Sequence, residues 1–388
     1  MITAFIDMVG LLMVLPLLPF YAVDLGGSGM IVGVLVSSFA VAQLISAPLW
    51  GRVSDRYGRR PALLIGLAFS AIGFVIFSYA GSILVLLLSR VVQGAGGGTT
   101  GVIQAYVADA TEPENRARSL GWISAATNLG VAIGPVLGSL TYGIGREAPG
   151  LIAAGLCLLN MLFAWRFLRE SHDLTAASTE GFKVRRSREA VMGVVRNSGE
   201  PASRLIWIYA ISMGAFQGMT AVLSLFLAVR FGATEQNIGY FFMYIGAISV
   251  MTRAGILGPT VDRFGEARLS RFGTVLLALG LATIPLAEGY IALALAVALV
   301  PLGTAFTFPC ITSLLSRVIS RHERGLYMGV QQTFGGVARV IGPLWAGWAY
   351  DHLGVSIPFW TGAVLVSGTL LLGLGMNEYT RPKAAVAA

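Results

Sequence analysis

The sequence has very little charge for its length. Only 12% of its 388 residues are Asp, Glu, Lys or Arg, whereas 55% are hydrophobic. A soluble domain usually carries about 25% charged residues, so this chain lacks the polar surface that a water-soluble globule needs. The mean hydropathy of +0.75 indicates instead that most of the chain is surrounded by lipid.

Side chains that build disulfides, metal sites and nucleotide sites are scarce as well. The two cysteines, Cys157 and Cys310, lie in apolar stretches and are expected to be small packing residues. The three histidines do not have the spacing of metal ligands, and no P-loop is present, which excludes an ATP-driven pump. The chain is therefore not expected to be an enzyme or to hold a metal.

What the sequence does contain is a series of long apolar runs. A helix needs roughly 20 mostly apolar residues to cross a bilayer, and these runs lack the alternation that is typical of barrel strands. The first run leads into further apolar runs, so no cleavable signal peptide is expected. The predicted spans are 2–22, 30–50, 61–80, 82–108, 119–142, 150–168, 204–228, 236–257, 270–287, 290–317, 325–349 and 356–376.

The twelve spans form two groups of six, which predicts an all-α polytopic membrane protein. We expect a six-helix bundle at 1–168, a basic cytoplasmic linker at 169–203 and a second six-helix bundle at 204–388. In the linker, Phe182 and Val191 lie among basic residues. This pattern is typical of a helix that lies on anionic lipid; the alternative is a disordered basic linker.

Positive charge is concentrated in every second loop, within 52–60, 116–118, 183–196, 263–271 and 321–324. Cytoplasmic loops of membrane proteins carry the excess of Lys and Arg. Both termini are therefore expected in the cytoplasm, with the chain in the cell (inner) membrane. The net charge of +8 is then a topology signal, and nucleic acid is not an expected partner.

Two sequence patterns occur once in each half. The first pattern recurs 207 positions later, with Gly51, Asp55, Arg56 and Gly58 matched by Gly258, Asp262, Arg263 and Gly265. The second recurs 208 positions later, with Gly134 and Pro135 matched by Gly342 and Pro343. This predicts a tandem duplication of a six-helix unit, a known transporter plan in which substrate binds at the membrane midplane between the halves.

These motifs resemble those of the major facilitator superfamily over nearly the whole chain. The segment 51–60 is similar to its loop motif between helices two and three, and Leu86, Arg90 and Gln93 with the glycines that follow resemble its fourth-helix motif. The segment 6–19, which contains Asp7, resembles the first-helix motif of drug:proton antiporters such as tetracycline-type efflux pumps. Spans three and nine lack the acids of those pumps, so tetracycline is not expected as the substrate.

The fifth-span pattern resembles the antiporter motif of the same superfamily, with Ser139 in place of one glycine. Small residues spaced four apart let helices approach closely, and prolines can bend them. We therefore expect a helix-packing role for Gly121, Gly130, Gly134, Pro135, Gly138, Gly342 and Pro343.

The resemblance implies proton-coupled efflux of a hydrophobic or amphipathic small molecule by alternating access, driven by the proton gradient without a cofactor. It also implies a cytoplasmic gate at the loop 51–60. Asp109 is expected to pair with Arg56 or Arg59, and our hypothesis is that Asp55, Arg56 and Asp109 form a latch that stabilises the outward-open state; the alternative is that the arginines only anchor the topology. The expected gate residues are Gly51, Asp55, Arg56, Gly58, Arg59, Arg60, Asp109, Asp262 and Arg263.

Ionisable side chains inside a membrane are costly and mark functional sites. Asp7 is the acid of the spans, and we expect it to carry the coupled proton, with Arg90 beside the proton route. The alternatives are an interfacial position for Asp7, which only six residues precede, and a structural role for Arg90. Arg339 lies about 14 residues into its span, hence roughly 21 Å deep.

Arg90, Arg253 and Arg339 outnumber the single interior acid, so an anionic substrate could balance the excess charge. A lipid, lysolipid or organic-anion translocator of the same fold is therefore the second hypothesis, and a non-transporting sensor or scaffold is the third. A monomer is expected, with the small molecule, protons and the bilayer as partners. The expected substrate-cavity residues are Gln43, Gln93, Asn128, Gln217, Gln332 and Arg339.

Overall fold

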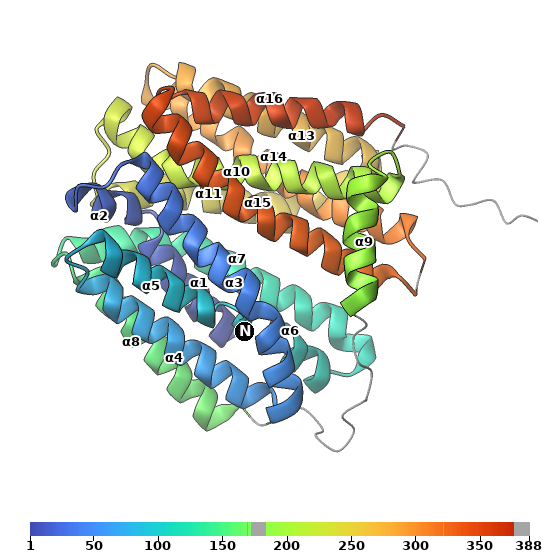
Figure 1. Cartoon of the computed structure of the whole chain (residues 1–388), viewed down its shortest axis with the longest axis horizontal. Coiled ribbons are helices and arrows are strands. Elements are labelled where there is room, and N and C mark those ends of the chain that lie inside the picture. The colour runs from blue at the N-terminus through green and yellow to red at the C-terminus, as the bar shows by residue number, and fades with distance from the viewer. Residues whose placement is uncertain (169, 172–183, 321, 376–388) are drawn as a thin grey trace, which may run out of the picture. The chain divides into compact units, whose positions relative to one another are not determined.

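The computed structural model consists of helices joined by short loops (Figure 1). It describes residues 1–168, 170–171, 184–320 and 322–375, and these ranges contain no β-strand. The helices are grouped into two compact units. Unit 1 comprises Met1–Glu180 with Ala221–Val250, and unit 2 comprises Gly181–Thr220 with Met251–Ala388.

Unit 1 contains the first six spans. Its helices are α1 (Ile2–Val14), α2 (Leu18–Asp24), α3 (Gly29–Tyr57), α4 (Arg59–Ser78), α5 (Ile83–Gly96), α6 (Thr99–Ala110), α7 (Pro113–Tyr142) and α8 (Ala148–Phe167). The later part of α10 (Pro201–Phe231) and nearly all of α11 (Ile238–Met251) pack with them. The two units are defined by contacts between residues. The boundary at 204, which is the expected start of the seventh span, therefore stays a prediction.

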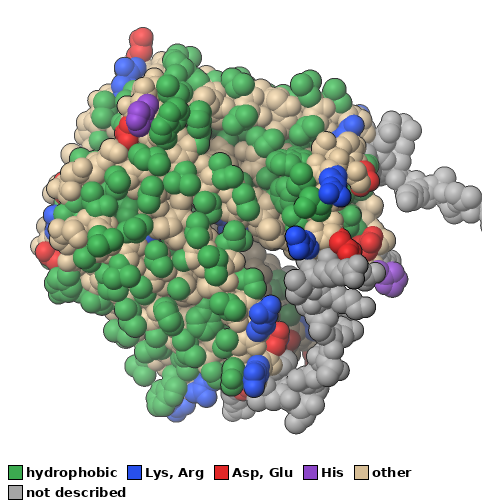
Figure 2. Space-filling model, viewed as in Figure 1, with side chains coloured by type: hydrophobic (Ala, Val, Ile, Leu, Met, Phe, Trp, Pro, Cys, Tyr) green, Lys and Arg blue, Asp and Glu red, His purple; other side chains and the backbone are tan. Residues whose placement is uncertain are grey.

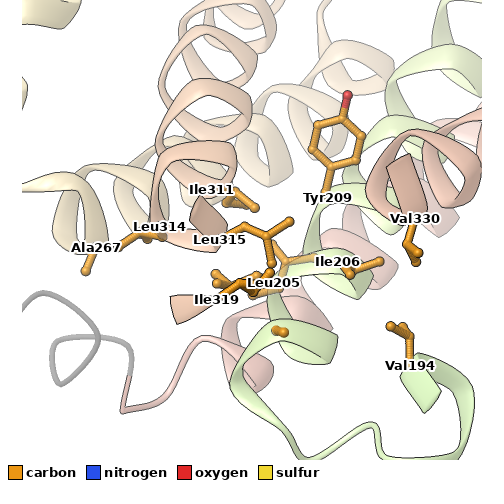
Figure 3. Packing of buried hydrophobic residues seen from close by; sticks show 12 residues of the cluster. Val194, Leu205, Ile206, Tyr209, Ala267, Ile311, Leu314, Leu315, Ile319 and Val330 are labelled. Carbon is orange, nitrogen blue, oxygen red and sulfur yellow. The ribbon is translucent and has the colours of Figure 1, made fainter. Parts of the chain in front are cut away.

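Unit 2 contains the remaining helices and the first part of α10. These helices are α9 (Val184–Arg196), η2 (Thr252–Ile256), α12 (Leu257–Phe264), α13 (Glu266–Thr283), η3 (Ile284–Leu286), α14 (Tyr290–Val318), α15 (Arg324–His352) and α16 (Ile357–Leu372). Its largest apolar cluster joins α9, α10, α13, α14 and α15 (Figure 3). Phe182 and Lys183 of the expected linker lie outside the described residues.

The helices account for all twelve predicted spans. Ten helical segments are long and apolar enough to cross a membrane, and α16 is a shorter apolar helix. The twelfth, α15, has 29 residues but includes Gln331, Gln332 and Arg339, which lower its hydropathy. On the face drawn in Figure 2, hydrophobic side chains cover most of the helix sides, as a bilayer requires.

Glycines make the same close crossing in both units. A Cβ added at Gly96 of α5 would lie 2.7 Å from the carbonyl oxygen of Gly66 of α4, and one added at Gly303 of α14 would lie 2.7 Å from that of Gly273 of α13. Only glycine permits such backbone contact. Gly273 follows Gly66 by 207 residues, and Gly303 follows Gly96 by the same number. The packing therefore supports the duplication that the motifs predict.

Candidate functional site

A break between α5 and α6 interrupts the regular helix in the middle of a span. α5 ends at Gly96 and α6 begins at Thr99. Backbone groups without a hydrogen bond are costly in lipid, and side chains spaced about one turn apart on α3 donate to carbonyl oxygens at this break, of which that of Gly94 also accepts from the Gly97 amide at 3.0 Å. The hydrogen bonds run from Gln43 Nε2 to Gly97 (2.9 Å), from Ser46 Oγ to Gly94 (3.1 Å) and from Trp50 Nε1 to Ala95.

Asp7 of α1 lies at this break. Its Oδ2 accepts a hydrogen bond from Thr99 Oγ1 at 3.3 Å, at the first residue of α6, where the helix dipole favours negative charge. Thr99 is buried and Asp7 is half-buried. The carboxylate borders a cavity of about 30 Å³, which has space for a water molecule. Polar side chains from other helices also line this cavity: Gln43 of α3, Ser70 of α4 and Gln93 of α5.

Arg90 is buried behind the cavity, with only 1% of its surface exposed. Its Nη1 donates a hydrogen bond to Oε1 of Gln93, one turn further along α5. Its guanidinium carbon lies 4.8 Å from the centroid of the Phe39 ring of α3. This cation–π contact stabilises the buried charge. The predicted common face of Arg90 and Gln93 is therefore present.

Gln93 links the acid and the base, since it borders the Asp7 cavity and binds Arg90. Its Nε2 and the Nε of Arg90 are buried without a hydrogen-bond partner among the described residues. Unpaired donors of this kind favour a mobile acceptor such as water or a carboxylate. The arrangement combines a carboxyl group that can bind a proton, space for water and a fixed cation within one unit.

Four other residues expected in the substrate cavity lie outside this small cavity of unit 1. Asn128 of α7 donates from Nδ2 to the carbonyl of Ser124 on its own helix at 2.8 Å. In unit 2, Gln217 is half-buried and Gln332 is exposed. Arg339 is half-buried and donates from Nε to the carbonyl of Gly335, one turn earlier, at 3.3 Å. These four residues remain predictions as substrate contacts.

In the gate motif of unit 1, Arg59 rather than Arg56 binds the two carboxylates. Arg59 bridges the carboxylates of Asp55 (2.5 Å) and Asp109 (2.9 Å) and also donates to Ser54 Oγ at 3.0 Å. Arg56 instead lies over the neighbouring Tyr57 ring at 5.4 Å. The expected latch of Asp55, Arg56 and Asp109 is thus corrected at its cation, because Arg56, three residues earlier, projects from a different helix.

Glu170 completes this end of unit 1. Its two carboxylate oxygens accept hydrogen bonds from the backbone amides of Arg59 (2.8 Å) and Arg60 (3.1 Å), so it caps the first turn of α4. The side chain of Arg60 donates to the carbonyl of Trp165. Gly58 has a positive φ of 102° and leaves no room for a Cβ beside Glu170, which explains the glycine of the motif. Gly51 makes no close contact within the described residues.

The second copy of the gate motif is built differently. Asp262 and Arg263 are exposed, and Arg263 lies over the Phe264 ring at 5.4 Å, as Arg56 does over Tyr57. The position that corresponds to Arg59 is Glu266, 207 residues later. Glu266 Oε1 accepts from Ser313 Oγ (2.7 Å) and from Arg317 Nη2 (2.8 Å) of α14. Its side chain is only 9% exposed.

The antiporter-like motif of α7 packs as predicted at most of its residues. Gly130, Gly134 and Gly138 lie against the backbone of α1, where an added Cβ would clash with the carbonyl oxygens of Phe5, Val9 and Met13. Gly342 makes the equivalent contact with Gly214 in unit 2, and Pro135 and Pro343 lie inside their helices. Gly121 departs from the expectation, since it is exposed with no described atom near it.

Ser139, which replaces a glycine of the motif, makes specific bonds within unit 1. Its Oγ donates to the carbonyl of Glu235 at 2.6 Å and accepts from the amide of Gly239 at 2.9 Å. Gly239 in turn lies against the backbone of Pro135. The serine therefore ties α7 to the start of α11, which a glycine cannot do.

Thr99, Glu170, Glu266 and Ser139 were not singled out as functional from the sequence. The repeat itself contains the signal for Glu266, because it follows Gly265 as Arg59 follows Gly58. Thr99 follows the glycine run that ends the fourth-helix motif. Glu170 has no sequence signal, since it reaches α4 across about a hundred residues of chain.

Comparison with known proteins agrees with this architecture. A family model described as Major Facilitator Superfamily matches residues 1–257 and 254–386. The chain is 30% identical to the class C tetracycline resistance protein of Escherichia coli, over 95% of this chain and 92% of that protein. It is 26% identical to multidrug resistance protein 2 of Bacillus subtilis, over 99% and 94%. The crystal structure of the human organic anion transporter MFSD10 superposes with a TM-score of 0.72 at 26% identity, over 96% of this chain and 97% of that one.

Proposed function

Because this chain belongs to the major facilitator superfamily of membrane transporters, we propose that it exports a hydrophobic or amphipathic small molecule in exchange for protons. Its relatives and structural neighbours are transporters, and it is not an enzyme. The observation that carries the proposal is the Asp7 carboxylate beside a water-sized cavity, with Arg90 and Gln93 behind it. Relatives named as a tetracycline resistance protein and a multidrug resistance protein, at 30% and 26% identity, support export as the direction of transport.

Asp7 acts as the proton carrier in this mechanism. In its ionised form the carboxylate accepts the bond from Thr99 and lies in the field of the α6 N-terminus. Binding a proton removes the charge, and water in the cavity supplies the route for that proton. Alternating access of the two halves then exposes the site to each side in turn. No bound cofactor is required, because the proton gradient supplies the free energy.

The proposed orientation follows from the loops. In this proposal the arginine-rich loops face the cytoplasm, as the positive-inside rule favours, and both termini are cytoplasmic. The proposal also has the chain in the cell (inner) membrane as a monomer. The Arg59 and Glu266 clusters, which follow the second and eighth spans, are then the cytoplasmic gate region.

Proteoliposomes with an imposed pH gradient test the coupling. Proton release on addition of the lipophilic cation ethidium is followed with an internal pH dye. Asp7→Asn is expected to lose this coupled proton flux by at least about tenfold, since an ordinary proton-transfer contribution is 100-fold or more, while ethidium still binds. The matched control is Asp24→Asn, which alters an exposed acid at the end of α2 and is expected to retain the flux.

Full gradient-driven flux in folded Asp7→Asn overturns the role of Asp7. Asp7→Glu provides a second check, because it keeps a titratable group at the site. Coupled flux in Asp7→Glu but not in Asp7→Asn supports proton carriage, whereas equal loss in both at normal ethidium affinity contradicts it.

A second candidate substrate class is the amphipathic organic anion, including lysolipids. The supporting observation is Arg339, a half-buried cation in the middle of α15 that donates to a carbonyl of its own helix. The human protein MFSD10, whose structure superposes on this chain, is an organic anion transporter. Fluorescein efflux that falls in Arg339→Gln, with ethidium efflux unchanged, would favour this class; equal fluorescein efflux in the variant and the parent would remove it.

A further inference from the structure

Helix α9 lies near the end of α15 in unit 2 (Figure 1). Its Val194 is 1% exposed and belongs to the apolar cluster that also contains Leu205 of α10, Leu315 of α14 and Val330 of α15 (Figure 3). Leu205 and Val330 lie near the first residues of their helices, and Leu315 lies near the last residues of α14. All three therefore lie at the end of unit 2 that bears its arginine-rich loops.

The buried side of α9 is narrow. Ala190, Val191 and Val194 pack against the cluster, and they occupy positions i, i+1 and i+4 on one side of the helix. This contact fixes which way the helix faces, so its remaining sides are oriented by packing rather than free to rotate.

The side of α9 that adjoins Val191 is exposed and has a mixed character. Arg188, Met192 and Val195 are spaced i, i+4 and i+7, and Arg196 is adjacent, so the four share one face. Met192 and Val195 are 43% and 52% exposed, and both arginines are exposed. A water-facing helix has no reason to present two large apolar side chains between two arginines. We call these four residues the outer face of α9.

The positive charge of α9 indicates which kind of partner its outer face binds. The helix carries four arginines and one glutamate, Glu189, in thirteen residues, and Glu200 follows it and accepts a bond from Asn197. Apolar side chains between arginines match the boundary between acyl chains and headgroups, where the apolar groups insert and the arginines bind phosphate oxygens. A neutral headgroup supplies no net charge for the excess of cations, whereas an anionic one does.

We propose that the outer face of α9 binds the headgroups of anionic phospholipids, with Met192 and Val195 inserted among the acyl chains. In this arrangement one side of α9 packs on the apolar cluster and the side next to it contacts the bilayer. This site is independent of Asp7 and of proton coupling, so its test does not depend on transport.

A fluorescent probe on α9 tests the contact in the full-length chain. Bimane is attached at Met192→Cys after the buried Cys157 and Cys310 are replaced by alanine. The chain is placed in nanodiscs of phosphatidylcholine alone or of phosphatidylcholine mixed with phosphatidylglycerol. We expect blue-shifted emission and protection from acrylamide quenching in the anionic discs, and weaker protection in the neutral ones.

Arg188→Gln with Arg196→Gln is expected to remove most of the difference between the two lipids. An arginine at an anionic surface contributes about fivefold to partitioning, so the pair contributes roughly 25-fold. The matched control is Arg116→Gln with Arg118→Gln, which removes equal charge from exposed positions on α7. This control is expected to keep the difference, because those arginines are not on α9.

Each other outcome overturns the proposal. A probe that is equally quenched in both kinds of disc shows that the outer face does not contact lipid. A probe equally protected in both shows insertion without anionic selectivity. Loss of the lipid difference in the Arg116 and Arg118 control shows a general charge effect rather than a site on α9.

Discussion

Gln93 in unit 1 and Val300 in unit 2 occupy the same place in two copies of one helix pair. Gly73 lies beside Gln93, and Gly280, 207 positions later, lies beside Val300. Three residues before each, Arg90 corresponds to Val297. The packing of the duplicated unit is retained while the buried base and amide are found in the first half and valines in the second.

Asp7 of unit 1 is likewise replaced by an uncharged residue in unit 2. Val9 of α1 packs on Gly134, and Gly214 of α10 packs on the corresponding Gly342, so Ser212 takes the place of Asp7. The hydrogen-bond partner of Asp7 is Thr99. In unit 2 the counterpart of Thr99 is Thr307, which lies beside Gly273. Ser212 and Thr307 are buried, and among the described residues their hydroxyls have no hydrogen-bond partner. At these matched positions the ionisable side chains are therefore in unit 1, in agreement with the role proposed for Asp7.

The two loop clusters differ in the sign of their charges. In unit 1 a cation, Arg59, begins α4 and an acid, Asp109, lies near the end of α6; in unit 2 an acid, Glu266, begins α13 and a cation, Arg317, lies near the end of α14. Helix dipoles favour acids at the start and cations at the end, by about 0.3–1 kcal/mol each. The second pair therefore agrees with both dipoles and the first opposes both.

The largest expected effect comes from placing an acid in the second half. Ser212→Asp is expected to lower the free energy of unfolding by about 3 kcal/mol, the cost of an unpaired acid within a span, because the valines at 297 and 300 supply no base. Thermal melting in detergent, followed by tryptophan fluorescence, measures this.

Ser212→Asn controls for size and is expected to be milder than Ser212→Asp. A Ser212→Asp chain as stable as the parent would show that the second half still accommodates an acid, and the assignment of proton chemistry to one half would be wrong.

A smaller effect separates the two loop clusters. Glu266→Gln is expected to cost about 2 kcal/mol, since it weakens two hydrogen bonds to a nearly buried charge. Asp109→Asn is expected to cost only about 0.5 kcal/mol, because Asp109 is 32% exposed and Asp55 still pairs with Arg59. Melting temperatures of the two isosteric variants give the comparison directly.

Equal losses in Glu266→Gln and Asp109→Asn would mean that burial and dipole direction do not distinguish the clusters. A larger loss in Asp109→Asn would reverse the comparison, since it would make the dipole-opposed pair the stronger one.

The most local expected effect is at Ser139, whose counterpart 208 positions later is Gly347. Ser139→Ala removes the acceptor of the Gly239 amide. A net hydrogen bond contributes about 1 kcal/mol, so exchange of that amide is expected to be roughly fivefold faster. Hydrogen exchange read by mass spectrometry on a peptide spanning Gly239 measures this, with the Gly246 region of α11 as the internal reference. Unchanged exchange would show that Ser139 does not hold α11.

The spans, the duplicated unit and the close packing of Gly130, Gly134 and Gly138 could be predicted from sequence, because hydropathy and local spacing specify them. Asp7 and Arg90 stood out because charge is rare in spans. The contact of Asp7 with Thr99 could not be predicted, since it depends on how α1 meets the helix break. Which of Arg56 and Arg59 binds Asp109 depends on where α3 ends and α4 begins, and the cap by Glu170 depends on a return of the chain to α4.

The glycine crossings hold α4 against α5 and α13 against α14 by direct backbone contact, so the two helix pairs have the same spacing at these points. A chimera carrying the α4–α5 pair in both halves is expected to keep this spacing and to gain a second buried arginine and glutamine. With an acid at Ser212, such a chain would hold two ionisable centres instead of one. Under the proposed mechanism, it would show whether the number of protons moved per substrate follows the number of these centres.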